Sequence, residues 1–271
     1  MEKVSTFKIF CMVVESAVCL ALFLVPLIRI RRQRGASRRQ FFIGGASYLF
    51  FGIGMRYMLL QTFTDEFGDI TTKRFAYALF SGIAAAVINE GGRYITLRFV
   101  NRKHDQQRDA LMFGTGYGGT EAIFFSGIAA FFGFTFASVI NNGQIDDLVE
   151  SFDASMQDTV RQQIESMYAM SGWDFLVSTL ECCIVFVLEV SLSIIMFKCA
   201  YEKKSWKLFL TCAGIHLVYS FVAQILTGLI PAIVIEVILA CIAGFAAYLA
   251  HKVFPSIKED EENDDFWDSV D

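Results

Sequence analysis

The sequence contains few charged residues and few prolines. Asp, Glu, Lys and Arg make up 19% of the 271 residues and proline occurs three times, whereas 55% of the residues are hydrophobic and 15% are aromatic. This composition excludes a chain that is disordered over most of its length, because it has too few solvating groups for its apolar content. The mean hydropathy of +0.48 also argues against a soluble domain with a single core.

The chain also lacks an excess of positive charge and the usual cofactor motifs. Its net charge of −5 at pH 7 argues against binding of nucleic acid. It contains no Gly-rich nucleotide loop with a Walker-type lysine, no C-x-x-C pair and no evident repeat. We therefore expect no cofactor. The seven cysteines lie inside or at the ends of apolar runs and are interpreted as small packing residues: Cys11, Cys19, Cys182, Cys183, Cys199, Cys212 and Cys241.

Long apolar runs are what the sequence has in abundance. A helix needs roughly 20 apolar residues to cross a hydrocarbon core of about 30 Å, and seven stretches are long enough. The sequence therefore predicts an all-α, polytopic membrane protein with seven spans, near residues 7–30, 40–60, 76–98, 110–140, 174–198, 206–228 and 230–253.

The positions of lysine and arginine predict the orientation, because these residues prefer cytoplasmic loops. Three alternate loops contain fourteen basic residues, at Arg29, Arg31, Arg32, Arg34, Arg38, Arg39, Arg98, Arg102, Lys103, Arg108, Lys198, Lys203, Lys204 and Lys207. The loops on the other side, 61–74 and 141–172, contain only Lys73, Arg74 and Arg161. We therefore expect an outer N-terminus and a cytoplasmic C-terminus.

Two segments outside the spans differ in character. Residues 143–170 combine acidic residues with apolar residues every three to four positions, which predicts an amphipathic helix on the outer surface. Residues 257–271 are acidic and favour a disordered cytoplasmic tail. The expected organisation is therefore a transmembrane domain over 1–256 and a tail over 257–271.

Ionisable residues within the spans are the strongest functional signal, because an unpaired charge at mid-bilayer costs at least about 2.5–3.5 kcal/mol. From the helical rise, five polar side chains on four spans lie about 10–16 Å from the cytoplasmic end. This inner layer comprises Glu90, Tyr117, Glu121, Glu189 and His216.

Helical spacing predicts which side chains of the inner layer can cooperate. Asn89 and Glu90 can both meet the guanidinium of Arg93 on one helix face, and Ser220 lies one turn after His216. A buried carboxylate beside a histidine can activate water by general base catalysis. A metal site is not expected, because His104 and His251 fall at predicted membrane boundaries and leave one histidine in the layer.

A second polar layer is predicted nearer the outside. Glu15, Glu181 and Glu236 lie at a similar depth to Arg56, which makes this arginine their expected partner. We interpret the layer as a structural ion-pair set, and its alternative role is a proton or ion path.

The inner-layer motifs resemble the YhfC family of bacterial membrane proteins. The run Asn89-Glu90-Gly-Gly-Arg93-Tyr94, the run Gly114-Thr-Gly-Tyr-Gly-Gly-Thr-Glu121-Ala122, a later span with Glu181 and a histidine at His216 carry the resemblance. That family is grouped with the PrsW and CAAX-type (Abi) glutamic intramembrane proteases. The chain departs from the family pattern at Asn89, where the first of two glutamates is expected, at Tyr117, where a histidine is expected, and at Glu189, where a histidine is common.

The resemblance implies a glutamic-type intramembrane peptidase of a bacterial cell membrane. Its catalytic candidates are Glu90, Glu121, His216 and Arg93, with Glu90 or Glu121 as base and with His216 and the Tyr117 hydroxyl as oxyanion donors. The implied partner is a membrane-embedded or membrane-proximal peptide within the lipid bilayer.

Two alternatives to catalysis remain open. One is a catalytically inactive relative that binds membrane segments or acts as a scaffold, and the other is a small-molecule or ion transporter. Saturation of the hydrogen bonds among Glu90, Glu121 and His216 would favour the inactive relative, whereas a water-sized cavity among them would favour the peptidase.

Overall fold

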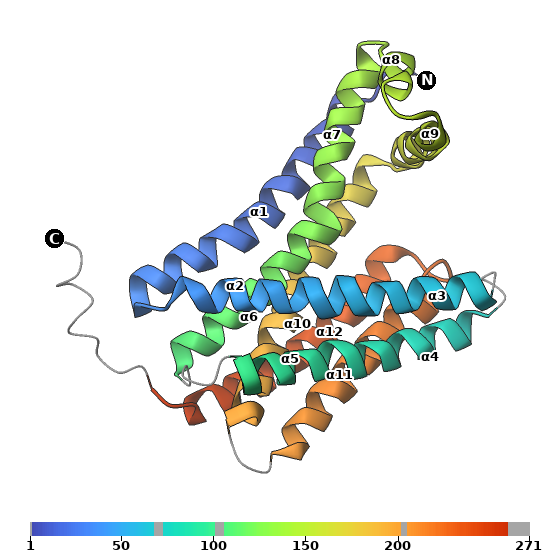
Figure 1. Cartoon of the computed structure of the whole chain (residues 1–271). Coiled ribbons are helices and arrows are strands. Elements are labelled where there is room, and N and C mark those ends of the chain that lie inside the picture. Colours follow the sequence, from blue (N-terminus) through green and yellow to red (C-terminus); the bar gives the residue numbers. More distant parts are fainter. Residues whose placement is uncertain (1, 68–72, 101–105, 202–204, 260–271) are drawn as a thin grey trace. The chain divides into compact units, whose positions relative to one another are not determined.

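The computed structural model describes residues 2–67, 73–100, 106–201 and 205–259, and these residues form helices joined by short connections (Figure 1). This architecture confirms the all-α prediction. Four short segments, η1 to η4, are π-helical turns within longer helical runs, and η5 is a 3₁₀ turn. The elements are α1 (Thr6–Arg34), α2 (Arg38–Ser47), η1 (Tyr48–Tyr57), α3 (Met58–Phe67), α4 (Arg74–Ala84), η2 (Ala85–Asn89), α5 (Glu90–Ile95), η3 (Thr96–Val100), α6 (Gln107–Ala122), η4 (Ile123–Gly127), α7 (Ile128–Asn141), α8 (Ile145–Glu150), α9 (Ala154–Ala169), α10 (Gly172–Tyr201), α11 (Trp206–Leu226), α12 (Ala232–Val253) and η5 (Phe254–Ser256).

Six helical runs of the described residues are long and apolar enough to cross a membrane. They are Thr6–Arg34, Arg38–Thr64, Gln107–Asn141, Gly172–Tyr201, Trp206–Leu226 and Ala232–Ser256, and each overlaps an expected span. The remaining expected span, 76–98, is helical throughout as α4, η2, α5 and η3, but it is not among the six. This segment contains the buried polar residues Asn89, Glu90 and Arg93, which lower its hydropathy. Seven spans and the orientation of the termini therefore remain predictions.

The described residues form two compact units, and the division falls inside helices rather than at a linker. Unit 1 contains the chain up to Ala21 and the segment Ala122–Cys183, and unit 2 contains Leu22–Glu121 and the chain from Ile184 onward. The boundaries lie within α1, near the junction of α6 with η4, and within α10.

Unit 1 packs a small apolar core around the start of α1. Met12, Ile164 and Met167 are buried in this core. The buried Lys8 ammonium donates hydrogen bonds to the carbonyl oxygens of Met167 and Tyr168 at 3.0 and 2.8 Å, so the cation satisfies carbonyls at the end of α9.

The segment expected as one amphipathic helix over 143–170 forms two helices, α8 and α9. The chain leaves the helix at 151–153, a break that the three-to-four spacing of apolar residues did not indicate. The apolar stripe itself is present, because Val149, Val160 and Ile164 are buried against the core of unit 1.

Unit 2 uses the glycines of α6 to bring three helical segments close together. A Cβ atom at Gly116 would collide with the backbone of Phe41 on α2, and one at Gly119 would lie 3.1 Å from the Cα of Phe23 on α1. Cβ atoms at Gly114 and Gly118 would instead meet α10, at 3.1 Å from side-chain atoms of that helix. The glycine run therefore allows the close backbone approach that its sequence predicts.

The predicted tail begins with ordered residues. Ile257 is buried, and the carbonyl oxygen of Lys258 accepts a hydrogen bond of 3.0 Å from the backbone N–H of Gln107. Residues 260–271, which make up most of the predicted tail, lie outside the described residues.

Candidate active site

The centre of unit 2 contains an ion pair within one helix. Arg93 on α5 donates from Nη1 to both carboxylate oxygens of Glu90, at 2.9 and 3.0 Å. Neither side chain has any exposed surface. The three-residue spacing places both groups on one face of the helix, as the sequence predicts.

Asn89 does not join this pair, although its spacing allows it. Both polar atoms of the Asn89 side chain lack a hydrogen-bond partner among the described residues, and the residue is fully buried. The prediction that Asn89 and Glu90 share the guanidinium is therefore wrong for Asn89. Asn89 is the last residue of the π-helical turn η2, where the backbone is wider than an α-helix, and such turns often occur near functional sites.

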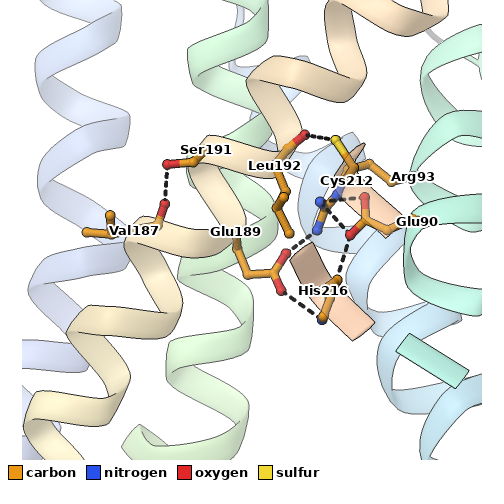
Figure 2. A network of polar contacts seen from close by, with 8 residues as sticks. All are labelled: Glu90, Arg93, Val187, Glu189, Ser191, Leu192, Cys212 and His216. Atoms are coloured by element: carbon orange, nitrogen blue, oxygen red, sulfur yellow. Dashed lines mark hydrogen bonds and ion pairs between the residues drawn. The ribbon is translucent and has the colours of Figure 1, made fainter. Parts of the chain in front are cut away.

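Two further helices contribute a second carboxylate and an imidazole. Figure 2 shows Glu189 on α10 and His216 on α11 facing the Glu90–Arg93 pair. Arg93 Nη2 forms a hydrogen bond and ion pair with Glu189 Oε2, so one guanidinium bridges two carboxylates. The His216 Nδ1 atom lies 2.7 Å from Glu90 Oε1, and its Nε2 atom lies 3.6 Å from Glu189 Oε1. We call Glu90, Arg93, Glu189 and His216 the central cluster.

The two ring nitrogens of His216 differ in their distance from the nearest carboxylate oxygen. The Nδ1 contact with Glu90 has hydrogen-bond length, whereas the Nε2 contact with Glu189 is too long for a direct hydrogen bond. A neutral imidazole that donates from Nδ1 to a carboxylate keeps a lone pair on Nε2. Nε2 of His216 and Oε1 of Glu189 are therefore the two atoms of the cluster best placed to act on a third group.

Tyr117 supports the cluster through its ring. The Arg93 guanidinium carbon lies 4.2 Å from the centre of the Tyr117 ring, and the Tyr48 ring packs edge-on against Tyr117 at 5.2 Å. A cation over an aromatic face is stabilised by the ring quadrupole. The Tyr117 hydroxyl has no hydrogen-bond partner among the described residues.

Gly118 explains how Glu189 reaches the cluster. A Cβ atom at this position would lie 3.1 Å from the Cβ of Glu189. A larger residue on α6 would therefore push Glu189 and its helix away from Arg93.

Glu121 and Ser220 lie at the edge of the cluster. The Glu121 carboxyl group lies close enough to Glu189 for the two groups to interact electrostatically. Ser220 follows His216 by one turn on α11 and accepts a hydrogen bond of 3.3 Å from Arg56 Nη2. Arg56 thus contacts a residue one turn from His216, which belongs to the predicted inner layer.

The predicted outer layer is divided between the two units. Glu15 on α1 is buried in unit 1 and accepts a hydrogen bond of 2.5 Å from the Ser178 hydroxyl, whereas Glu181 on α10 is exposed. Glu236 on α12 is buried in unit 2, as is Ser220, the residue that Arg56 contacts. The pairing of Arg56 with these three glutamates remains a prediction.

Glu90, Glu189 and His216 also have the composition of a metal site, contrary to the expectation from histidine count alone. One donor atom from each residue lies within 4.8 Å of the others. Catalytic zinc sites use three protein ligands of this kind, and metal–ligand distances of about 2.1 Å place two ligand atoms roughly 3.4 Å apart. The separation of 3.6 Å between His216 Nε2 and Glu189 Oε1 is close to that value. Two of the three donors are therefore separated by a distance that suits a divalent cation, with Arg93 as a competing positive charge.

Fold and site together define a multi-pass helical membrane protein with a buried centre of carboxylates, imidazole and guanidinium. The profile of the family described as YhfC intramembrane metalloprotease matches residues 17–239, which include every residue of the central cluster. The chain belongs to this family, as its motifs predict.

A curated relative supports the membrane assignment. The chain is 26% identical over 252 residues to a protein described as an uncharacterised membrane protein YhfC of Bacillus subtilis (strain 168), and the match covers 86% of this chain and 95% of the relative. No solved structure matches the chain. Both the family and the apolar helices place this protein in a cell membrane as a multi-pass protein.

Proposed function

We propose that the chain is an intramembrane peptidase in which Glu189 and His216 activate water. The observation that carries the proposal is the environment of His216, with Nδ1 at 2.7 Å from Glu90 and Nε2 facing Glu189 at 3.6 Å. A carboxylate that binds one imidazole nitrogen fixes the orientation and tautomer of the ring, so that the other nitrogen can accept a proton. Glu90 is the positioning residue in this proposal.

Sequence reasoning placed the catalytic base at Glu90 or Glu121, and the geometry favours Glu189. Both oxygens of Glu90 accept hydrogen bonds from Arg93, and one of them also contacts His216. A carboxylate with so many donors is a weak base. Glu189 Oε1 faces the imidazole without a direct hydrogen bond to it, so a water molecule contacting both groups can lose its proton to either.

Arg93 holds the two carboxylates at a fixed separation. Its guanidinium contacts both of them and is itself supported by the Tyr117 ring. A centre fixed in this way needs little reorganisation during reaction, which is the general condition for electrostatic catalysis. The proposed substrate is a peptide segment in or near the membrane, because the cluster is buried between apolar helices.

The family description also implies a metal ion. Glu189, His216 and Glu90 are the residues that would hold it, and a divalent cation supplies polarisation of the scissile carbonyl and acidification of water. In that case Glu90 could still contact Nδ1 of the imidazole, whereas a Glu189 oxygen that ligates the cation would not also act as the base.

The test is cleavage of a transmembrane peptide by the purified full chain in lipid nanodiscs. We expect Glu189→Gln to lower turnover by about 100-fold or more, the usual contribution of a general base. The matched control is Glu181→Gln, which removes an exposed carboxylate from the same helix and is expected to leave turnover unchanged. Equal turnover of Glu189→Gln and wild type would contradict the proposal.

A second candidate function is binding of membrane segments without cleavage. The observation that favours it is the saturation of Glu90 by Arg93 and His216, together with Asn89 and Tyr117 at the two positions where the family pattern has acidic and imidazole side chains. This candidate predicts no cleavage by wild type in the same assay. It also predicts that photo-crosslinking captures the transmembrane peptide equally with wild type and with Glu189→Gln.

A further inference from the structure

Unit 1 contains a pair of cysteine side chains in direct contact. The Sγ atom of Cys19 on α1 lies 3.1 Å from the Sγ atom of Cys182 on α10. Both residues are buried, and both are free thiols. The chain separates them by 163 positions, so their contact is a product of helix packing.

A second contact one turn earlier fixes the register of the two helices. The Ser178 hydroxyl on α10 donates a hydrogen bond of 2.5 Å to Glu15 on α1. Glu15 precedes Cys19 by four residues, and Ser178 precedes Cys182 by four residues. The two contacts therefore form successive rungs between helices that run in the same direction here, and the thiols are held in register rather than meeting by chance.

Gly127, on the third segment η4, packs against Cys19. A Cβ atom at Gly127 in η4 would lie 3.0 Å from the Cβ of Cys19, which is tight contact. The absence of a side chain at Gly127 thus lets η4 pack closely against Cys19. Cys183, the next residue on α10, is only partly buried and provides an internal comparison.

We propose that Cys19 and Cys182 form an oxidisable dithiol that hydrogen peroxide, a small neutral oxidant, converts to a disulfide joining α1 to α10. The sulfur atoms need to approach by about 1 Å to reach the usual S–S bond length of about 2.05 Å. Neither the spacing of the cysteines in the sequence nor the peptidase proposal assigns this site.

The peroxide is the oxidant that accepts the two electrons released when the disulfide forms. One thiol sulfur attacks a peroxide oxygen, which breaks the O–O bond, forms a sulfenic acid and releases one water molecule. The second thiol sulfur then attacks the sulfenic sulfur, forming the S–S bond and releasing the hydroxyl group as a second water molecule. Two thiols are oxidised and one peroxide is reduced.

The test uses the full chain, purified in detergent under reducing conditions. After removal of the reductant, the protein is treated with hydrogen peroxide, its remaining thiols are alkylated with N-ethylmaleimide, and its peptides are analysed by mass spectrometry. We expect most molecules to contain a linked pair of Cys19 and Cys182 peptides that dithiothreitol separates. Undiminished alkylation of Cys19 after peroxide treatment would overturn the proposal.

Two variants identify the partner of Cys19. Cys182→Ser should reduce disulfide-linked Cys19 at least tenfold, whereas Cys183→Ser should give the wild-type yield. Linkage of Cys19 to Cys183 or to a second chain, at the yield expected for the proposed pair, would also overturn it. The wild-type measurement decides the question even if Cys182→Ser fails to fold.

Discussion

Arg93 is the residue on which the central cluster depends. It is fully buried, it contacts both carboxylates and it lies over the Tyr117 ring. Burial of a guanidinium is costly unless its charge is balanced and its donors are satisfied. The two carboxylates provide that balance, which explains why three charged groups can share one apolar interior.

Tyr117 provides the clearest residue-scale prediction. Its ring supports Arg93, whereas its hydroxyl has no partner among the described residues. We expect Tyr117→Phe to change the free energy of unfolding by less than about 0.5 kcal/mol. Tyr117→Leu should cost about 2 kcal/mol or more, because it removes a desolvated cation–π contact and the packing of a ring.

Thermal unfolding of the purified variants in detergent measures this difference. The same pair of variants tests the role of the hydroxyl in catalysis. If the hydroxyl donates to an oxyanion, Tyr117→Phe will lower turnover without lowering stability. If Tyr117→Leu proves as stable as Tyr117→Phe, the ring does not support Arg93.

At this scale, the sequence predicts local pairs better than distant ones. The spacing of Glu90 and Arg93 on one helix was sufficient to predict their contact. The place of Glu189 at the centre depends on α5, α6 and α10 meeting in space, which no spacing within one helix encodes. The same limitation explains why the contact between Cys19 and Cys182 was not foreseen. Asn89 was expected to contact Arg93 because the spacing assumes a regular α-helix, whereas Asn89 ends a π-helical turn.

At the scale of elements, the glycines of α6 position the site. Gly116 faces α2, Gly119 faces α1, and Gly114 and Gly118 face α10, so one short run permits three close helix contacts. Glycines in such a run permit close approach because they have no side chain. The periodicity of the sequence does not reveal which glycine faces which neighbouring helix. It also does not reveal the π-helical turn η4, which follows α6 directly.

Substitution of Gly116 by alanine tests this packing. The added Cβ would collide with the backbone of Phe41, which has no flexible side-chain end that could move aside. We expect Gly116→Ala to reduce the free energy of unfolding by about 1–3 kcal/mol, the usual cost of overpacking.

The matched control is Gly244→Ala on α12, where a Cβ would meet no atom within 4 Å. This variant should be as stable as wild type or slightly more stable, because alanine favours the helix. Unfolding of both variants at the same temperature would show that α2 and α6 do not need the close approach.

At the scale of the whole molecule, composition alone was enough for the fold class. Apolar runs separated by basic loops predicted a polytopic helical protein, and six helices of sufficient length and apolarity overlap those runs. The remaining run, Arg74–Val100, contains Glu90 and Arg93 and is not among these six. Glu90 and Arg93 thus form part of the site and also lower the hydropathy of the helical run to which they belong.

The predicted orientation of the two termini depends on whether Arg74–Val100 crosses the membrane. If it crosses the membrane, seven spans place the N-terminus outside and the C-terminus in the cytoplasm. We expect a single cysteine introduced at Gln144 to react with a membrane-impermeant maleimide in intact cells, and one introduced at Arg38 to react only after lysis. Both probes are best placed in a background that lacks the exposed Cys241. Equal labelling of the two positions in intact cells would contradict the predicted topology.

The role of His216 is tested most directly by the cleavage rate of a transmembrane peptide with and without its imidazole. We expect wild type to cleave the peptide in lipid nanodiscs and His216→Ala, still folded and inserted, to cleave it at least 100-fold more slowly. Cleavage at the same rate by both proteins, or no cleavage by either, would show that His216 does not activate water for peptide hydrolysis.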